Sequence, residues 1–344
     1  MLKFLPNTRL LLTRTDNIGD LILTLPAVAS LKRRYPDIFI GFLCSSYAAP
    51  VLLQNPAINK IIPVDDGFPF TTLKVIREGN YHASLHFFIE PKGTILARMA
   101  NIPRRIGPAS KIWSVLLTDK VSQNRSKVER HEAEYNLELA RECGADGLSF
   151  PPAIFLSALE KREGQQILSM ACKVPEPSPV VIHPGSHQHV ETWPIDHFME
   201  LAKKIGDRGD KVVFTAGPGE EKFIEAAQQL RHKNVHTLTA GSLALRQLAA
   251  VISNARIFIG NSSGPLHIAT ALNIPTISFY PQVPLVTSAK RWGPFGNSKL
   301  HRVLTPTPAD RPLKNISSDM ALEWVINVLQ SKAHPDSSGE QFIG

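Results

Sequence analysis

The chain has 344 residues, too many for one typical core and about right for two domains of roughly 100–200 residues each. Its composition is 43% hydrophobic and 20% charged, which is globular and excludes collagen-like, coiled-coil and mostly disordered chains. Lys and Arg number 38 against 30 Asp and Glu, so the formal net charge is +8, which favours an anionic partner.

The sequence predicts neither a membrane span nor a metal site. It has no run of about 18 uncharged apolar residues, and Lys3, Arg9 and Arg14 interrupt the N-terminal apolar stretch before a secretory signal could form. The three cysteines are widely spaced and lack a CxxC pair, so neither a disulfide framework nor a zinc site is implied. We therefore expect a cytoplasmic protein whose cysteines are buried thiols.

Short apolar strands alternate with helix-length amphipathic segments in the first half of the chain. The predicted strands are 10–13, 38–43, 61–64 and 84–88, and the predicted helices are 20–34, 71–78, 94–100 and 132–143. The helix from Asp20 is the clearest, because apolar residues recur at helical spacing until Pro36 prevents continuation.

The same alternation returns after a proline-rich stretch around residues 149–179. The predicted strands are 180–183, 211–215, 257–260 and 276–279, and the helices are 195–205, 220–231, 245–252, 265–272 and 317–330. Strands separated by helices need crossover connections, so the fold class is α/β with parallel sheets. We expect a domain at 1–155, a connection at 156–178, a second domain at 179–316, and a helix at 317–333 that packs back toward the first domain.

The loop between the first strand and the first helix is the first candidate site. It lies at the carboxyl edge of the predicted sheet, where ligands collect in open parallel sheets. Asp20 is either the N-cap of the helix or a general base with its carboxylate free to take a proton. Asp16, four residues earlier, is expected to form a turn.

Two loops of the second half could bind phosphate. Gly185 and Ser186 follow the strand 180–183 and could present backbone N–H groups to phosphate oxygens, or could form an ordinary turn. Ser262, Ser263 and Gly264 precede the helix at 265–272, whose N-terminal N–H groups and dipole could bind a nucleotide diphosphate.

Three further residues of the second half have a functional and a structural interpretation. His267 could face the phosphate site or be a partly buried histidine. Glu220 and Glu221 open the helix at 220–231, where they could accept ribose hydroxyls or favour the helix dipole without any ligand. The full GxGxxG motif is absent from that turn, so no dinucleotide fingerprint is predicted.

Taken together, the motifs resemble glycosyltransferase family 9, the lipopolysaccharide heptosyltransferases. The resemblance runs from Leu10 to about Gly296, and the motifs follow in the family's order. They are Asn17-Ile18-Gly19-Asp20, His131 with Tyr135-Asn136-Leu137, His183-Pro184-Gly185-Ser186 with Trp193-Pro194, Gly241-Ser242-Leu243, and Asn261-Ser262-Ser263-Gly264-Pro265-Leu266-His267.

The resemblance implies a GT-B architecture, in which two Rossmann-like domains face each other across a cleft. It also implies transfer of a heptose from ADP-heptose to the inner core of lipopolysaccharide, with inversion and without a metal or other cofactor. Asp20 occupies the position of the family's proposed base. The implied location is the cytoplasmic face of the inner membrane, with peripheral membrane contact. Arg104 and Arg105 are our candidates for acceptor anion contacts; the alternative is that they are two solvated arginines in a loop.

Two positions depart from the family's pattern. Glu191 stands two residues before Trp193, where the family usually has a basic residue, and Ser262 stands where it usually has Asp. A carboxylate about 4 Å from a diphosphate oxygen would cost about 4 kcal/mol at an effective dielectric near 20. Glu191 must therefore point elsewhere, or another cation must compensate, for which His187 and Arg291 are candidates.

These departures leave a second hypothesis open. The protein could be a catalytically weak or inactive relative that binds a nucleotide sugar or glycan without transferring it. A nucleotide-sugar epimerase of the GT-B class ranks lower, because the motif order matches transferases better. Nucleic-acid binding ranks lowest, since the basic residues are dispersed and no known reader module is present.

Overall fold

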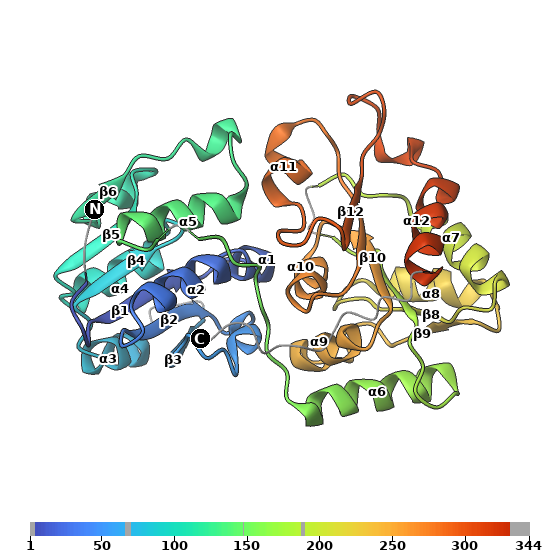
Figure 1. The fold of residues 1–344 in the computed structure, drawn as a ribbon, viewed down its shortest axis with the longest axis horizontal. Helices are drawn as coiled ribbons and strands as arrows, with labels where there is room; N and C mark the ends of the chain where they lie inside the picture. Colours follow the sequence, from blue (N-terminus) through green and yellow to red (C-terminus); the bar gives the residue numbers. More distant parts are fainter. Residues whose placement is uncertain (1–3, 66–69, 147, 187–189, 331–344) are drawn as a thin grey trace. The chain divides into compact units, whose positions relative to one another are not determined.

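The computed structural model describes residues 4–65, 70–146, 148–186 and 190–330, which form two compact units. The first unit comprises Met1–Ser157 with Gln282–Gly296, and the second comprises Ala158–Pro281 with Asn297–Gly344. Each unit contains one six-stranded parallel sheet with helices around it (Figure 1). The α/β class with two Rossmann-like domains is therefore confirmed.

The sheet of the first unit has the strand order β3-β2-β1-β4-β5-β6. Its strands are β1 (Arg9–Arg14), β2 (Phe39–Ser45), β3 (Lys60–Val64), β4 (Ala83–His86), β5 (Arg104–Pro108) and β6 (Asp119–Val121). In the central strand β1, Leu10, Leu11 and Leu12 are fully buried. A parallel sheet is covered on both faces, which is why this strand is a continuous apolar run.

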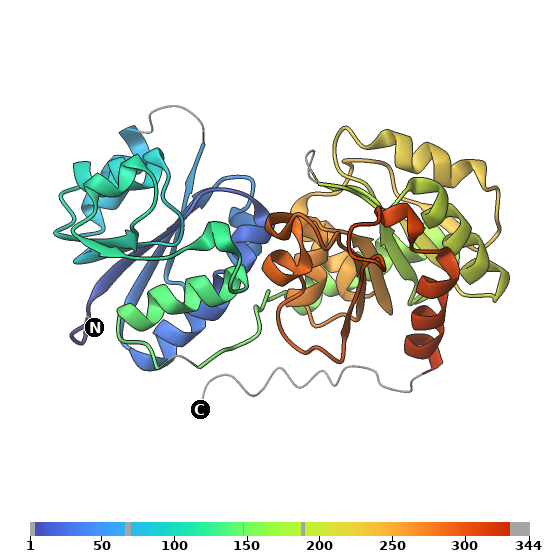
Figure 2. The same cartoon turned by 90° about the horizontal axis from the view of Figure 1, so that it is seen from above.

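Helices cover the first sheet, and α2 lies beside α5 in Figure 2. The helices are α1 (Ile18–Ile22), α2 (Leu25–Arg34), α3 (Phe70–Glu78), α4 (Pro91–Met99) and α5 (Glu132–Glu142), with 3-10 turns η1 (Ala49–Leu52), η2 (Ile112–Leu116) and η3 (Arg125–Lys127). The single helix predicted at 20–34 is thus two helices. Pro26 lacks an N–H for a continuous helix, and the Thr24 hydroxyl donates to the Leu21 carbonyl at 2.6 Å where α1 ends.

The sheet of the second unit has the order β12-β11-β10-β7-β8-β9. Its strands are β7 (Val180–His183), β8 (Val212–Phe214), β9 (Val235–Thr237), β10 (Ile257–Asn261), β11 (Thr276–Phe279) and β12 (His301–Leu304). The chain runs outward from β7 in one direction and from β10 in the other. The boundary between β7 and β10 is therefore the topological switch point, where ligands bind in such sheets.

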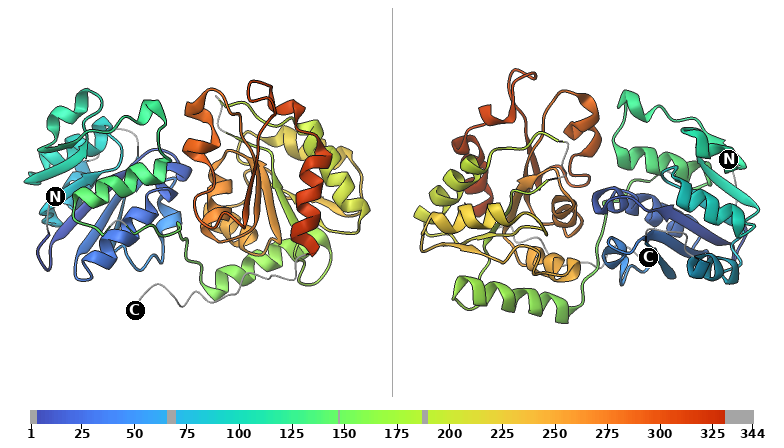
Figure 3. Two further views of the ribbon diagram at one scale, coloured as in Figure 1. Left: turned by 45° about the horizontal axis from the view of Figure 1, so that its top comes forward. Right: turned by 180° about the vertical axis from the view of Figure 1, so that it is seen from behind.

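The helices of the second unit include one in the stretch 156–178, which was expected to be a connection, and the final helix, which was expected to pack toward the first domain. They are α6 (Ala158–Cys172), α7 (Ile195–Asp207), α8 (Glu221–Gln229), α9 (Leu245–Ser253), α10 (Gly264–Ala271) and α12 (Ser318–Gln330), with the 3-10 turn η5 (Leu313–Asn315). Figure 3 shows α6, from the proline-rich stretch, lying along α9. The final helix α12 packs against α7, and its Ala321 and Val325 join the core of the second unit. These contacts assign α12 to the second unit, whereas the sequence analysis expected it to pack back toward the first domain.

The segment 282–296 also departs from the expected boundaries. It carries the 3-10 turn η4 (Leu285–Thr287) and the short helix α11 (Ala289–Trp292), and it groups with the first unit although the chain around it belongs to the second. Its contacts with α5 are part of the candidate site.

Candidate functional site

Asp20 lies within α1, at the carboxyl edge of the first sheet. The N-cap of α1 is Asn17, whose side chain makes no capping bond, so Asp20 is not the N-cap. Its Oδ1 accepts a hydrogen bond from Arg14 Nη2 at 2.5 Å, and its Oδ2 accepts one from Asn17 Nδ2 at 3.2 Å. The side chain keeps 14% of its surface exposed. Its carboxylate is thus oriented from two sides, and the capping interpretation is excluded.

Arg14, the last residue of β1, binds three carboxylates with a fully buried guanidinium. Besides Asp20, its Nε lies 2.7 Å from Asp16 Oδ1 and its Nη1 lies 3.1 Å from Glu132 Oε1. These charges raise the pKa of Arg14 against the effect of burial. Burial raises the pKa of Asp16 to about 6, with Asp20 adding to the effect and Arg14 opposing it. Asp16 is therefore a member of this charge cluster and more than a turn former.

Glu132, the first residue of α5, is the second centre of the cluster. Its side chain is 1% exposed and pairs with Arg125 at 2.5 Å and with Arg291 at 3.4 Å, in addition to Arg14. Burial opposes ionisation, but the three guanidinium groups hold the pKa of Glu132 below its ordinary value. The sequence analysis missed Arg14, Arg125 and Glu132 as partners, because residues 118 positions apart give no local signal of contact.

The pairing of Arg291 explains why the segment 282–296 groups with the first unit. Arg291 Nη1 also donates to the Arg125 carbonyl at 3.2 Å. His131, the N-cap of α5, places its Nε2 at 2.9 Å from the Gly293 carbonyl and stacks on Phe295 with the ring centroids 5.0 Å apart. Arg291 is therefore engaged by Glu132 within the first unit, and its role as a compensating cation stays a prediction.

In the second unit, the two predicted phosphate loops meet at the switch point. The Ser186 hydroxyl donates to the Ser262 carbonyl at 2.6 Å, and Asn261 Nδ2 donates to the Pro184 carbonyl at 2.8 Å. These bonds tie the loop after β7 to the loop after β10. Gly185 and Ser186 therefore lie beside the start of α10, as the switch-point argument requires.

The start of α10 has the features predicted for an anion site. Ser263 is the N-cap and accepts from the Leu266 N–H at 3.4 Å, and Pro265 occupies the first turn. His267 is 4% exposed, which agrees with the interpretation as a buried histidine. The first N–H groups of α10 therefore lie at the carboxyl edge of the second sheet, beside Ser262, Ser263 and Gly264, where they can bind an anion.

Glu220 and Glu221 differ in their surroundings. Glu220 Oε2 accepts from the Gly217 N–H at 2.7 Å, and a Cβ placed on Gly185 would lie only 2.1 Å from Glu220 Oε1. Burial raises the pKa of Glu220. Glu221 is exposed and accepts from the Gly219 N–H at 3.2 Å. The side chain that lies closest to Gly185 is thus the Glu220 carboxylate of the same unit.

Glu191 is bonded to the backbone at the start of η5. Its Oε1 accepts a hydrogen bond from the N–H of Leu313 at 2.7 Å. This bond agrees with the first alternative of the sequence analysis, that this carboxylate points elsewhere than at a diphosphate. His187, the other proposed compensating cation, lies outside the described residues.

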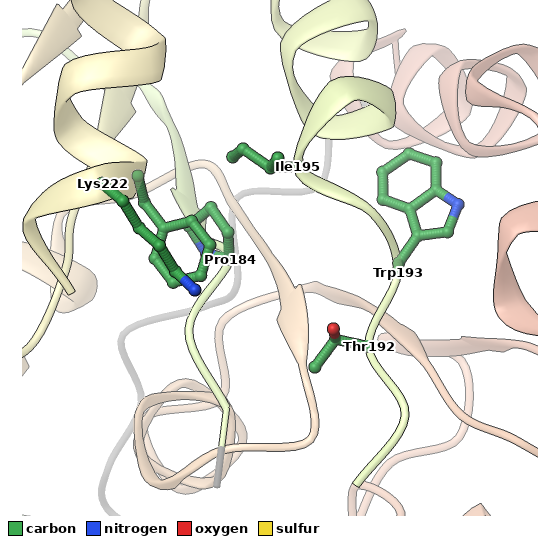
Figure 4. Close-up of a pocket in the computed structure, with 6 residues that line it drawn as sticks. Pro184, Thr192, Trp193, Ile195 and Lys222 are labelled. Atoms are coloured by element: carbon green, nitrogen blue, oxygen red, sulfur yellow. The ribbon is translucent and has the colours of Figure 1, made fainter. Parts of the chain in front are cut away.

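A pocket of about 260 Å³ opens beside the Gly185 loop within the second unit (Figure 4). Its lining comes from the end of β7, the segment before α7 and the start of α8: Pro184, Thr192, Trp193, Ile195, Lys222 and Phe223. Trp193 is held in the core by stacking on Phe279 at 3.9 Å between ring centroids and by donating to the Ile316 carbonyl at 2.8 Å. Lys222 is a cation at this pocket that the sequence analysis did not select.

Arg104 and Arg105 begin β5 at the amino edge of the first sheet, opposite the edge that carries Asp20. Arg104 pairs with Asp119 at 2.9 Å, and Arg105 donates to the carbonyls of Leu116 and Ile102. The structure does not bring them to Asp20, and their role as acceptor contacts stays a prediction that this placement does not favour.

The described part of the chain contains neither a metal-binding cluster nor a membrane-spanning helix. No group of three or more His, Cys, Asp or Glu side chains there could hold a metal ion. No helix there is both long and apolar enough to cross a bilayer.

Comparisons with known proteins agree with this geometry. The sequence profile of glycosyltransferase family 9 (heptosyltransferase) matches residues 71–316. A Haemophilus influenzae protein named among the glycosyltransferases is 30% identical over 333 residues, covering 91% of this chain and 94% of the relative. Lipopolysaccharide heptosyltransferase 3 of Escherichia coli is 29% identical over 309 residues, covering 82% of this chain and 85% of the relative.

A solved structure shares the fold. The Escherichia coli ADP-heptose lipopolysaccharide heptosyltransferase II superposes with a TM-score of 0.78 at 24% identity, covering 94% of this chain and 98% of that one. This structural similarity, together with the profile match, assigns the fold with its two sheets to the GT-B class. The chain belongs to glycosyltransferase family 9 and is a heptosyltransferase-like glycosyltransferase.

Proposed function

We propose that the protein moves a heptose from ADP-heptose to the inner core of lipopolysaccharide with inversion, and that Asp20 is the general base. The observation that carries this proposal is the Asp20 carboxylate at the carboxyl edge of the first sheet, oriented by Arg14 and Asn17. Two names support the donor and the acceptor: the Escherichia coli relative is named a lipopolysaccharide heptosyltransferase, and the solved Escherichia coli structure is named an ADP-heptose lipopolysaccharide heptosyltransferase.

The reaction follows from the chemistry of a carboxylate beside a hydroxyl. Asp20 accepts the proton of the acceptor hydroxyl as its oxygen forms a bond to the anomeric carbon of the heptose. The bond from that carbon to the diphosphate oxygen breaks, and ADP leaves with the electron pair. Attack from the face opposite the leaving group inverts the anomeric centre.

The second unit supplies the stabilisation of the leaving group. The N–H groups at Ser263 and Gly264, with the dipole of α10, face the negative charge that develops on the diphosphate. Gly185 and Ser186 border the same place, and Lys222 adds a cation at the neighbouring pocket. Glu220 and Glu221 remain the candidates for the ribose hydroxyls. We expect the reaction to need no metal or other cofactor, so that activity should survive EDTA.

The hypothesis of a relative that binds without transferring rested on Glu191 and Ser262. Because the Glu191 carboxylate is bonded to the Leu313 N–H, it does not add repulsion at the phosphate loops. Ser262 still offers its carbonyl to Ser186 and so keeps the two loops together. The bond made by Glu191 favours the active enzyme, whereas the Ser262 carbonyl, a backbone group, does not distinguish the two hypotheses.

The experiment that tests the function uses the full chain with ADP-heptose and a truncated lipopolysaccharide acceptor. Release of ADP that depends on the acceptor, with a mass increase of one heptose on the acceptor, is the expected result. ADP-heptose binding measured by calorimetry without such release would contradict the proposal and support binding without transfer. We place the enzyme at the cytoplasmic face of the inner membrane, where its lipid-linked acceptor would be met.

A further inference from the structure

The 3-10 turn η2 carries a patch of exposed apolar side chains. Ile112 is 80% exposed, Val115 is 69% exposed and Trp113 is 38% exposed, all within four residues. Exposed apolar residues scattered singly are ordinary, but a contiguous group usually marks an interaction surface. We call Ile112, Trp113 and Val115 the η2 patch.

The backbone of the η2 patch is fixed at both ends. Ser114 N–H donates to the Lys111 carbonyl at 3.2 Å, and Arg105 Nε donates to the Leu116 carbonyl at 2.7 Å. Leu117, immediately after the turn, is 6% exposed and anchors the segment in the first unit. The outward direction of the patch is therefore held by local bonds.

The chemistry around the η2 patch matches an anionic lipid surface. Tryptophan, with an apolar body and one N–H, is enriched where hydrocarbon meets headgroups. Exposed Lys111 directly precedes the patch, exposed Lys120 follows it on β6, and the whole chain carries a net charge of +8. Basic residues beside apolar ones bind anionic bilayers through both attraction and insertion.

The η2 patch is also joined to the Asp20 network of the same unit. Lys111 Nζ lies 3.8 Å from the centroid of the Phe88 ring, and the Arg14 guanidinium lies 5.3 Å from the same centroid. Arg14 in turn holds Asp20 at 2.5 Å. One aromatic ring therefore separates the segment that bears the patch from the residue that orients the base.

From this juxtaposition we infer that the η2 patch docks the first unit on a bilayer containing anionic lipid, close to where the acceptor hydroxyl must reach Asp20. The inference rests on the proposed function for its acceptor, but the docking itself does not. It names the surface by which an enzyme without a membrane-spanning helix in its described residues would meet a lipid-linked substrate.

The test measures how the wild-type full chain and its variants co-sediment with vesicles made of phosphatidylethanolamine and phosphatidylglycerol. The variant Ile112→Ser/Trp113→Ser/Val115→Ser is expected to lose at least about tenfold in vesicle affinity, because it removes three insertable side chains. The matched control is Leu159→Ser/Met170→Ser on α6, whose side chains are 66% and 80% exposed, and it should bind as the wild type does. Vesicles of phosphatidylcholine alone should bind the wild type more weakly.

Transfer assays separate docking from a loss of fold. The patch variant should transfer to a deacylated, water-soluble core at the wild-type rate and should lose transfer to the same core embedded in vesicles. Ile112→Ser/Val115→Ser, which keeps Trp113, should show an intermediate loss of binding. Vesicle affinity equal to wild type in the patch variant, or an equal loss in the α6 control, would overturn the inference. Vesicle binding by a wild type that transfers to neither acceptor would instead contradict the proposed function and leave the docking surface supported.

Discussion

Replacing Glu132 by Gln tests the charge cluster most sharply, because this one side chain joins β1, η3 and the segment 282–296. The carboxylate is 1% exposed and pairs with Arg14, Arg125 and Arg291. The Gln amide can still accept one hydrogen bond, but it leaves the three guanidinium groups with one negative charge fewer. Breaking a buried ion pair from one side costs about 3–5 kcal/mol.

We expect the lower end of that range, about 3 kcal/mol, since Arg14 keeps Asp16 and Asp20 as partners. At about 2–4 °C per kcal/mol for a domain of this size, Tm should fall by about 6–12 °C. The folded pKa of Glu132 is lowered, so its contribution is present above its unfolded pKa and is lost as the pH falls through the folded pKa. The deficit of the variant should therefore shrink in acid.

The measurement is urea and thermal denaturation at neutral and acid pH. The matched control is Glu138→Gln on the same helix, whose partner Arg130 is 2.9 Å away but half exposed. That surface pair should contribute less than about 1 kcal/mol. A free energy of unfolding for the Glu132 variant within about 1 kcal/mol of wild type at neutral pH would refute this account of the cluster.

Three further substitutions probe the two loop systems. Because the folded pKa of Asp16 is raised, the stability of the wild type should fall as the pH rises from about 4 through about 6. The free energy of unfolding of Asp16→Asn, measured by denaturation, should therefore increase relative to that of the wild type over this interval. A constant difference between the two proteins would show that Asp16 does not titrate in the fold as described. Gly185→Ala should raise the KM for the donor about tenfold with little change in Tm, because the new Cβ displaces the Glu220 carboxylate; steady-state kinetics would contradict this if KM were unchanged. Ser263→Ala should cost about 1 kcal/mol through loss of the N-cap of α10 and weaken ADP binding in calorimetry; equal ADP affinity would argue against the phosphate site.

Most of the fold could be predicted because its signals are local. The apolar runs at β7 and β11 and the helix that ends before Pro36 follow from residue type and spacing alone. The strands β5, β6, β9 and β12 were missed, because each is short and carries charged or polar residues. Three of them, β6, β9 and β12, are edge strands, and β5 lies next to the edge. Their pairing is decided by neighbours far away in the chain.

The site divides in the same way. Asp20 lies in the helix that follows β1, and Gly185 and Ser263 follow β7 and β10, so each parallel sheet brings its residues to the carboxyl edge of its own unit. The partners of Asp20 are different: Arg14 was not predicted as a partner, and its bond to Glu132 depends on the packing of α5. The capping of Leu313 by Glu191 joins residues 122 positions apart and has no sequence signal. Such contacts depend on tertiary packing, so the spacing of residues along the chain does not predict them.

The central claim is that Asp20 removes the proton from the acceptor. The most direct measurement is single-turnover release of ADP by Asp20→Asn, with ADP-heptose affinity and Tm recorded on the same preparation. Loss of a general base predicts a rate about 10²–10⁴-fold lower with donor affinity and Tm close to wild type. Release at the wild-type rate would contradict the claim, because the amide cannot accept the proton.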